Sequence, residues 1–362
     1  MEFGLSEEQA ALQSSIGGYL ESNSSLKRVQ EYADSGDSRA DDVWGGLREL
    51  GVPGITIGED HGGVGLGMLE AALIAETLGG HVAPTPFVST SVMTPLAIAT
   101  AGSDEQKERC LPVLADGSVV AGAALTEVIG ARQNGGVRFD GGKLNGRALF
   151  VLDYEADVYL VADENRALYL VEGEAAGLSK QLLTTVDKTR HVGELVFENT
   201  PAGLLPGTSD PEVCARVIDA GRIMLAADTL GASRTMLAKA VAYSKERVQF
   251  ERVIASFQAV KHMCADMAAR LEPCAAMVWY AAHAFDNIPS EARLTACHTK
   301  AHVSEMGTFV ARTATEVHGG IGFTDELGLH LWFKRINANR QLLGGPDRVR
   351  EEAAKLQGLV SA

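Results

Sequence analysis

The hydrophobic pattern of this chain changes its period twice, and no other feature of the sequence constrains the fold as strongly. Residues 1 to 115 carry apolar side chains at helical spacing, and residues 116 to 208 contain short runs rich in Val, Leu, Phe and Tyr. Residues 209 to 362 return to long helical repeats. We therefore predict an α+β chain with an N-terminal helical domain, a middle antiparallel β domain and a C-terminal helical bundle.

The first of these zones contains three clear helical stretches. Ser6 is a candidate N-cap for the first stretch, Gly51 follows the second, and the third stops at Gly79 and Gly80. The glycine-rich segment GEDHGGVGLG lies between the second and third stretches. Because a single glycine-rich loop is more often a turn than a phosphate site, we interpret it as a turn between helices.

The second and third zones predict strands and then long helices. Six short segments are typical of strands: SVVAGAAL, GVRFD, KLNGRALFVLD, DVYLVAD, ALYLVEG and GELVFEN. Asp140, Gly141 and Gly142 are suited to a tight turn between two of them. Three or four long helices should cover residues 211–247, 256–285, 291–319 and 347–359. Long helices joined by short loops indicate a four-helix bundle.

Charge and cysteine usage exclude several classes of function. The net charge is −15, which argues against nucleic acid, because phosphate binding needs clustered Lys and Arg. The five cysteines have neither metal-ligand spacing nor a disulfide framework, so we expect free thiols, no metal site and a cytoplasmic location. The N-terminus does not resemble a signal peptide, and no apolar run reaches the ~20 residues of a membrane span. The cysteines are Cys110, Cys214, Cys264, Cys274 and Cys297.

One short stretch combines charge and aromatic groups at a break between helices. SKERVQFERVIASFQAVKH runs from Ser244 to His262 and contains five cationic or potentially cationic side chains, two Phe and two Gln. The spacing predicts a helix that ends near Arg247, an irregular joint, and a second helix from Phe257. A joint with this composition is suited to contact a ligand.

This stretch is similar to the RxQFGxPIxxFQAVKHxxADM segment of the acyl-CoA dehydrogenase family of flavoproteins. EVHGGIGFTDELGLHLWFKR resembles the family's QxHGGxGFTxExxxHxxxKR segment, and ALTE and TTVDKTRHVGELVFEN resemble the entry to its flavin loop and the exit of its β domain. The resemblance covers essentially the whole chain. It implies the three-part fold, the cofactor FAD, an acyl-CoA substrate, and electron-transfer flavoprotein or a similar electron acceptor.

The resemblance also implies that this chain contacts the FAD of a neighbouring subunit, so that oligomers form through residues 209–362. A guanidinium is suited to a pyrophosphate and an aromatic ring to adenine. The implied contacts are Arg247 with the pyrophosphate, Phe250 with the adenine, Gln258 with the same ligand, and Glu316, Gly319 and Gly320 in the second motif.

Three positions of these two motifs depart from the family. Glu251 replaces a Gly, Val253 replaces a Pro, and Glu316 replaces a Gln. A carboxylate close to a diphosphate repels it. We therefore expect the contact to FAD in trans to be retained but weakened.

The catalytic base of the family is missing from both of its usual positions. Most members carry a Glu just before a terminal Gly-Thr turn, where this chain has Leu343, and some carry it on the first bundle helix, where this chain has Gly221. The neighbouring carboxylates Asp219, Asp228 and Asp347 each require a displaced substrate to replace it. We interpret them as surface or capping groups, with Asp228 kept as an alternative base.

The flavin loop departs from the family as well. The family's TEPxAGSD is TEVIGARQN here, in which Thr126 and Glu127 are retained, and Thr126 is the expected contact to FAD. The family's aromatic-x-Thr segment corresponds to Phe150, Val151 and Leu152, and a leucine cannot supply a hydroxyl to the flavin.

Three hypotheses follow from these losses. The sequence favours a non-catalytic partner in a heteromeric, α2β2-like acyl-CoA dehydrogenase that desaturates an acyl-CoA thioester at the α and β carbons, as family members on steroid side-chain CoA thioesters do. This hypothesis requires a homologous catalytic subunit. The second is a self-sufficient FAD-dependent dehydrogenase with Asp228 as base. The third is a flavin-free scaffold.

Overall fold

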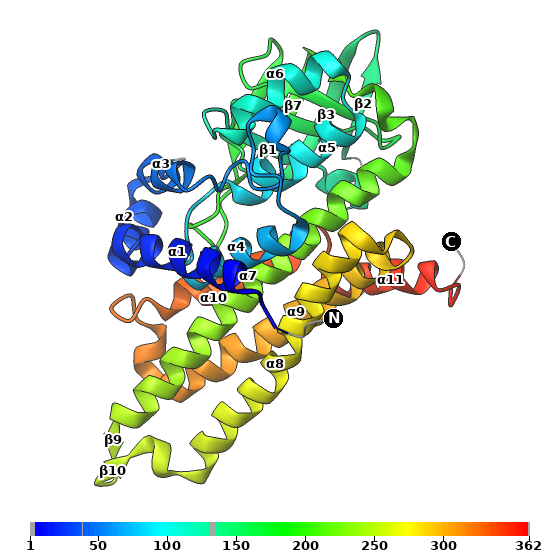
Figure 1. The fold of residues 1–362 in the computed structure, drawn as a ribbon. Helices are drawn as coiled ribbons and strands as arrows, with labels where there is room; N and C mark the ends of the chain where they lie inside the picture. Colours follow the sequence, from blue (N-terminus) through cyan, green and yellow to red (C-terminus); the bar gives the residue numbers. More distant parts are fainter. Residues whose placement is uncertain (1–3, 38, 131–134, 361–362) are drawn as a thin grey trace.

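The computed structural model describes residues 4–37, 39–130 and 135–360, and Figure 1 shows their arrangement. Helices come first, then a sheet, then long helices, in the predicted order. The N-terminal helices are α1 (Glu7–Asn23), α2 (Leu26–Ser35), α3 (Asp41–Glu49), α4 (Met68–Gly80), α5 (Thr94–Ala101) and α6 (Asp104–Ala115), and a π-helical segment, η2 (Val88–Met93), leads directly into α5.

Local signals explain where these helices begin and end. The Ser6 hydroxyl accepts a hydrogen bond from the Gln9 amide, and the Gln9 side chain accepts one from the Ser6 amide at 2.9 Å, so the predicted N-cap is confirmed as a capping box. Gly51 lies just beyond α3 with φ +73°. The glycine-rich loop connects α3 to α4, and a Cβ at Gly63 would collide with the Ile57 carbonyl. The loop is therefore a tight turn, as predicted.

The middle part is one sheet, in which the strand order is β6-β7-β3-β1-β4-β5-β8 and β2 pairs with β3. The strands are β1 (Ala121–Ala124), β2 (Gly136–Asp140), β3 (Lys143–Leu152), β4 (Val158–Ala162), β5 (Leu168–Glu172), β6 (Leu178–Leu182), β7 (Val192–Pro201) and β8 (Gly203–Leu204). Gly141 and Gly142 both have positive φ and form the predicted turn between β2 and β3.

The prediction of a purely antiparallel sheet is wrong at one pair, because β1 and β4 are parallel. The consecutive strands β3 and β4 lie on opposite sides of β1. Since β3 runs antiparallel to β1, the chain reversal that leads into β4 makes β4 parallel to β1. The edge strand β6, with the sequence LSKQL, was not predicted because it is largely exposed and has no apolar alternation.

The C-terminal part contains four packed helices, but the fourth differs from the predicted one. The helices are α7 (Pro211–Glu246), α8 (Gln258–Asn287), α9 (Pro289–His318) and α10 (Leu329–Gln341), with α11 (Pro346–Leu356) packed on α9. The prediction placed the fourth helix at residues 347–359, which is α11. The helix α10 was not predicted, because two of its buried residues, Arg335 and Asn339, are polar and interrupt its apolar spacing.

A small hairpin separates α7 from α8. Its strands, β9 (Val248–Gln249) and β10 (Arg252–Val253), form the predicted irregular joint. In Figure 1 the hairpin lies at the far end of the long helices, away from the sheet. The apolar core, by contrast, runs continuously through all three parts. None of the described helices is long and apolar enough to span a bilayer.

Candidate functional site

The two positions at which the family carries its catalytic base meet at one point in this structure. A Cβ built on Gly221 of α7 would lie 2.5 Å from Cδ1 of Leu343 and 2.7 Å from Sδ of Met93. Leu343 is only 1% exposed, and Met93 is fully buried. Apolar side chains therefore fill the space in which either base would lie, and no carboxylate reaches it from Gly221 or Leu343.

The backbone at Leu343 is held from two directions. The Nε of buried Arg222 donates to the Leu343 carbonyl at 3.0 Å. Lys300 donates to the carbonyls of Asn339 and Arg340, at 2.6 and 3.2 Å, and so caps the C-terminal end of α10 just before Leu343. Burial, with a smaller contribution from the neighbouring guanidinium groups, lowers the pKa of Lys300 to about 7. Leu343 itself has φ +56°, so its side chain points into the core from a constrained turn.

Asp228, the alternative base, is engaged in a buried network. Its Oδ1 accepts from Asn339 at 2.6 Å, and its Oδ2 accepts from Arg190 at 3.0 Å and from Arg335 at 3.1 Å. Arg335 also donates to Asp187 at 3.0 Å. The network joins α7 and α10 to the loop before β7. Asp228 is therefore a buried structural group with both oxygens engaged, and its interpretation as a surface or capping group is wrong.

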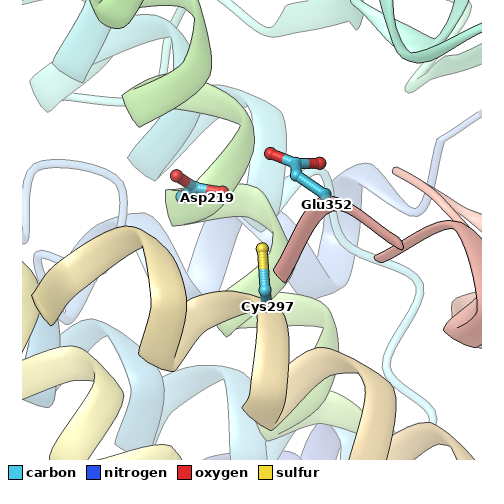
Figure 2. A group of neighbouring side chains, drawn as sticks. All are labelled: Asp219, Cys297 and Glu352. Carbon is cyan, nitrogen blue, oxygen red and sulfur yellow. The ribbon is translucent and has the colours of Figure 1, made fainter. Parts of the chain in front are cut away.

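Asp219 lies in a second buried cluster. Figure 2 shows Asp219 of α7, Cys297 of α9 and Glu352 of α11 with their side chains directed toward one another. Their ligand atoms all lie within 4.8 Å of each other, as in a metal site. The Arg222 guanidinium is the cation that serves them, because it donates to Asp219 at 3.0 Å, to Cys297 at 3.5 Å and to Glu352 at 2.8 Å.

The two carboxylates of this cluster respond differently to their surroundings. Burial raises the pKa of Asp219 to about 7 despite the charge of Arg222. Burial also raises the pKa of Glu352, but hydrogen bonds and charge from Arg222 and Arg293 outweigh it and lower the pKa to about 2. Asp347, the third candidate base, is exposed in the first turn of α11, 3.9 Å from Arg350.

The residues expected to contact a neighbour's FAD lie on the surface at the hairpin. Arg247, Phe250 and Gln258 are all exposed, and Phe250 is 86% exposed. Phe250 and Glu251 occupy the hairpin turn with φ +52° and +66°, where glycine is favoured. This geometry explains the family's Gly at the position of Glu251. The hairpin presents an aromatic ring and a guanidinium outward, as contact in trans requires.

The second motif ends beside the helix that leads into the hairpin. His318 stacks on Tyr243 with ring centroids 4.7 Å apart, which brings the end of α9 against the last turns of α7. Gly319 has φ +64°, and a Cβ at Gly319 or Gly320 would meet nothing within 4 Å. The space beside both glycines is open to an approaching group. Glu316 is exposed on the last turn of α9, three residues before Gly319.

The residues expected to lie beside FAD within this chain are buried, unlike the exposed residues of the hairpin. Thr126 is buried, and its hydroxyl donates to the Phe150 carbonyl at 3.3 Å. Leu152 is buried and apolar. Residues 131–134 of the predicted flavin loop lie outside the described residues. Among the described groups, the outward set keeps the guanidinium and aromatic groups expected for FAD, whereas in the inward set the Thr126 hydroxyl is engaged by Phe150 and Leu152 has none.

Sequence reasoning missed the polar residues that organise this region. Arg190 and Arg335 lie within the segments that resemble the family, but their partners are distant in sequence. A signal was nonetheless present, because Arg335 and Asn339 interrupt the apolar side of a helical segment. Buried charges of this kind need partners.

Comparisons with known proteins agree with this geometry. The family models for the acyl-CoA dehydrogenase N-terminal and C-terminal domains match residues 6–118 and 212–355. The chain is 29% identical to acyl-CoA dehydrogenase IpdE2 of Mycolicibacterium smegmatis over 98% of this chain and 100% of that protein. It is 30% identical to an acyl-CoA dehydrogenase of Bacillus subtilis over 75% of this chain and 78% of that protein.

A solved structure resembles the fold over nearly its full length. The steroid ACAD Tcur3481-Tcur3483 aligns with a TM-score of 0.89 at 28% identity and covers 98% of both chains. The fold, the two motifs and these matches lead to one conclusion: the chain belongs to the acyl-CoA dehydrogenase family.

Proposed function

We propose that this chain is the non-catalytic subunit of a heteromeric acyl-CoA dehydrogenase. The observation that carries the proposal is the meeting of Gly221 and Leu343 at one apolar point. Abstraction of the α proton of a thioester requires a carboxylate within reach of that carbon. Neither base position supplies one, and Asp228 is held by three donors.

The chain contributes to the complex from its outward face. Arg247, Phe250 and Gln258 contact the FAD held by a homologous catalytic subunit, and the open space beside Gly319 and Gly320 admits that cofactor. Bound FAD would accept the hydride that leaves the β carbon of the acyl group. The C-terminal helices, residues 209–362, form the surface between subunits, because the hairpin and the second motif both lie there.

The substrate class follows from similarity and is part of the proposal. The resemblance to a steroid ACAD over nearly the full chain supports a bulky steroid side-chain CoA thioester as the substrate of the complex. Electron-transfer flavoprotein or a similar protein would serve as the electron acceptor of the complex. The self-sufficient alternative would need Asp228 to leave Arg190, Arg335 and Asn339 for the substrate.

The test is reconstitution with a full-length family member that carries Glu at the position of Leu343. The chain alone should not oxidise an acyl-CoA with an artificial electron acceptor, because general base catalysis contributes typically 10²–10⁴-fold. Co-expression should give a flavin-containing complex whose activity is abolished when the other subunit's base is changed from Glu to Gln. Turnover by the single chain that disappears in Asp228→Asn would overturn the proposal.

A further inference from the structure

A cavity of about 380 Å³ lies in the N-terminal part of the chain, apart from the position of the missing base. It is open to one side and is bordered by the glycine-rich loop, α5, α6 and the last turn of α8. Met93, at the end of η2, packs toward Gly221 of α7, whereas its neighbours Val92 and Leu96 line the cavity. The cavity and the base position therefore lie on different sides of the same helical segment.

The walls of this cavity are apolar. Val92, Pro95 and Leu96 come from η2 and α5, Leu111 comes from α6, and Phe285 comes from α8. All except Leu96 are buried. Phe285 is fixed from behind by Arg216, whose guanidinium lies 3.9 Å from the ring centroid and donates to the Phe285 carbonyl at 2.9 Å. The size and lining are those of a site for a small organic molecule.

The acidic groups at the cavity already have other roles. Asp286 accepts a hydrogen bond from the Met68 amide at 2.7 Å and so caps the N-terminus of α4. Asp60 belongs to the rim, because its side chain is 78% exposed and lies 3.6 Å from His61.

Lys107 is the polar group of the cavity that has no such role. It projects from α6 into the lining and is half-buried. Among the residues that the structure describes, no acidic side chain lies within 4.0 Å of its ammonium group and no hydrogen bond engages it. The ammonium group has three donors, and a charge-assisted hydrogen bond from it to an anionic oxygen is stronger than a hydrogen bond between neutral groups.

We propose that this cavity binds a small organic monocarboxylate, with its apolar body between Leu96, Leu111 and Phe285 and its carboxylate on Lys107. The apolar walls exclude an inorganic anion as the preferred ligand, because such an ion would leave them unfilled. The single unengaged cation selects one negative charge. This binding site is independent of the proposed function of the chain as a subunit.

Three probes of matched shape test the assignment: cyclohexanecarboxylate, cyclohexylmethanol and cyclohexylmethylamine. Calorimetric titration of the full chain should show the carboxylate binding at least tenfold more tightly than the alcohol and the amine. Lys107→Met keeps the length of the side chain but removes its charge, and should weaken carboxylate binding about tenfold, the typical effect of one charge-assisted hydrogen bond. Leu96→Trp should fill the cavity and abolish binding.

Arg109→Met is the matched control, because Arg109 lies two residues further along α6 and its side chain is 61% exposed. This variant should bind the carboxylate as the unaltered chain does. Circular dichroism confirms that each variant is folded. Tighter binding of the amine, or carboxylate binding that is unchanged in both Lys107→Met and Leu96→Trp, would overturn the proposal.

Discussion

Replacing Gly221 by alanine tests whether the two base positions truly meet. The added methyl group would lie 2.5 Å from Cδ1 of Leu343, about 1 Å closer than the ordinary separation of two carbon atoms. Overpacking of this kind costs about 1–3 kcal/mol. Alanine is favoured over glycine in a helix by about 1 kcal/mol, so the net destabilisation of the single variant should be about 0–2 kcal/mol.

The second variant of the cycle removes the side chain that causes the collision. Leu343→Ala should cost about 2–5 kcal/mol, because a fully buried leucine is lost. In that background Gly221→Ala should be stabilising by about 1 kcal/mol, since Cδ1 is absent and the flexible side chain of Met93 can adjust. The coupling energy between the two substitutions should therefore equal the overpacking cost, about 1–3 kcal/mol.

Urea denaturation of the four proteins, followed by circular dichroism, measures this coupling energy. The neighbouring buried residue Leu342 provides the control, because none of its atoms is among those nearest to a Cβ at Gly221. Gly221→Ala and Leu342→Ala should be additive within about 0.5 kcal/mol. Additivity between Gly221→Ala and Leu343→Ala would refute the convergence of the two positions, and with it the main support for a vacant catalytic site.

Four further predictions concern charged groups. Arg247→Ala should lower flavin retention in the assembled complex by roughly tenfold or more, because a charge-assisted contact to pyrophosphate contributes ~1.5–3 kcal/mol; Lys245→Ala is the control, and an unchanged flavin-to-protein ratio on dilution would remove Arg247 from the site. Glu352→Gln should lower the free energy of unfolding by about 2–3 kcal/mol at pH 7, because the folded pKa of Glu352 is lowered to about 2. This difference between the variant and the unaltered chain should disappear as the pH falls from 4.5 toward 2. Asp219 behaves oppositely, because its folded pKa is raised to about 7. Its contribution to the free energy of unfolding therefore decreases as the pH rises from 3.8 to 7. Asp219→Asn should reduce this decrease in urea midpoints measured from about pH 4 to 8. Identical pH profiles for the two variants would contradict both assignments. Asp228→Asn should lower the thermal midpoint while leaving the activity of each assembled complex unchanged; a hundredfold loss would identify Asp228 as the base.

The order of the three parts could be predicted from sequence because each part repeats its apolar residues at a different period. The prediction failed for elements whose buried side chains are polar and for elements whose side chains are mostly exposed. The buried face of α10 contains the polar residues Arg335 and Asn339, so its sequence lacks a continuous apolar pattern. The strand β6 is an exposed edge strand. The parallel pairing of β1 with β4 depends on which strands become neighbours, and this is decided by contacts across the sheet rather than by local pattern.

The candidate site was predictable to the extent that motifs fixed positions along the chain. Alignment with the family identified Gly221 and Leu343 separately, but it could not show that they touch, since 122 positions separate them in the sequence. The same holds for Asp228, whose partners Arg190 and Arg335 lie 38 and 107 residues away. A carboxylate on a helix looks the same in sequence whether it faces solvent, a substrate or two guanidinium groups.

The exposed hairpin is the surface feature that the proposed assembly would explain. Phe250 is 86% exposed at the end of a projecting turn, and both turn residues have the left-handed backbone that costs non-glycine residues of order 1–3 kcal/mol. Burial of a phenylalanine side chain contributes about 1.5–3 kcal/mol. In the isolated chain the backbone strain lowers the stability, and the ring does not offset it, because no described residue covers the ring beyond its edge contact with Phe257. Contact with a neighbouring subunit and its cofactor would bury the Phe250 ring, while the apolar packing at Leu343 already stabilises the chain without any ligand. Under the proposed function, a partner subunit would bury the exposed ring of Phe250, whereas the apolar packing at Leu343 needs no partner.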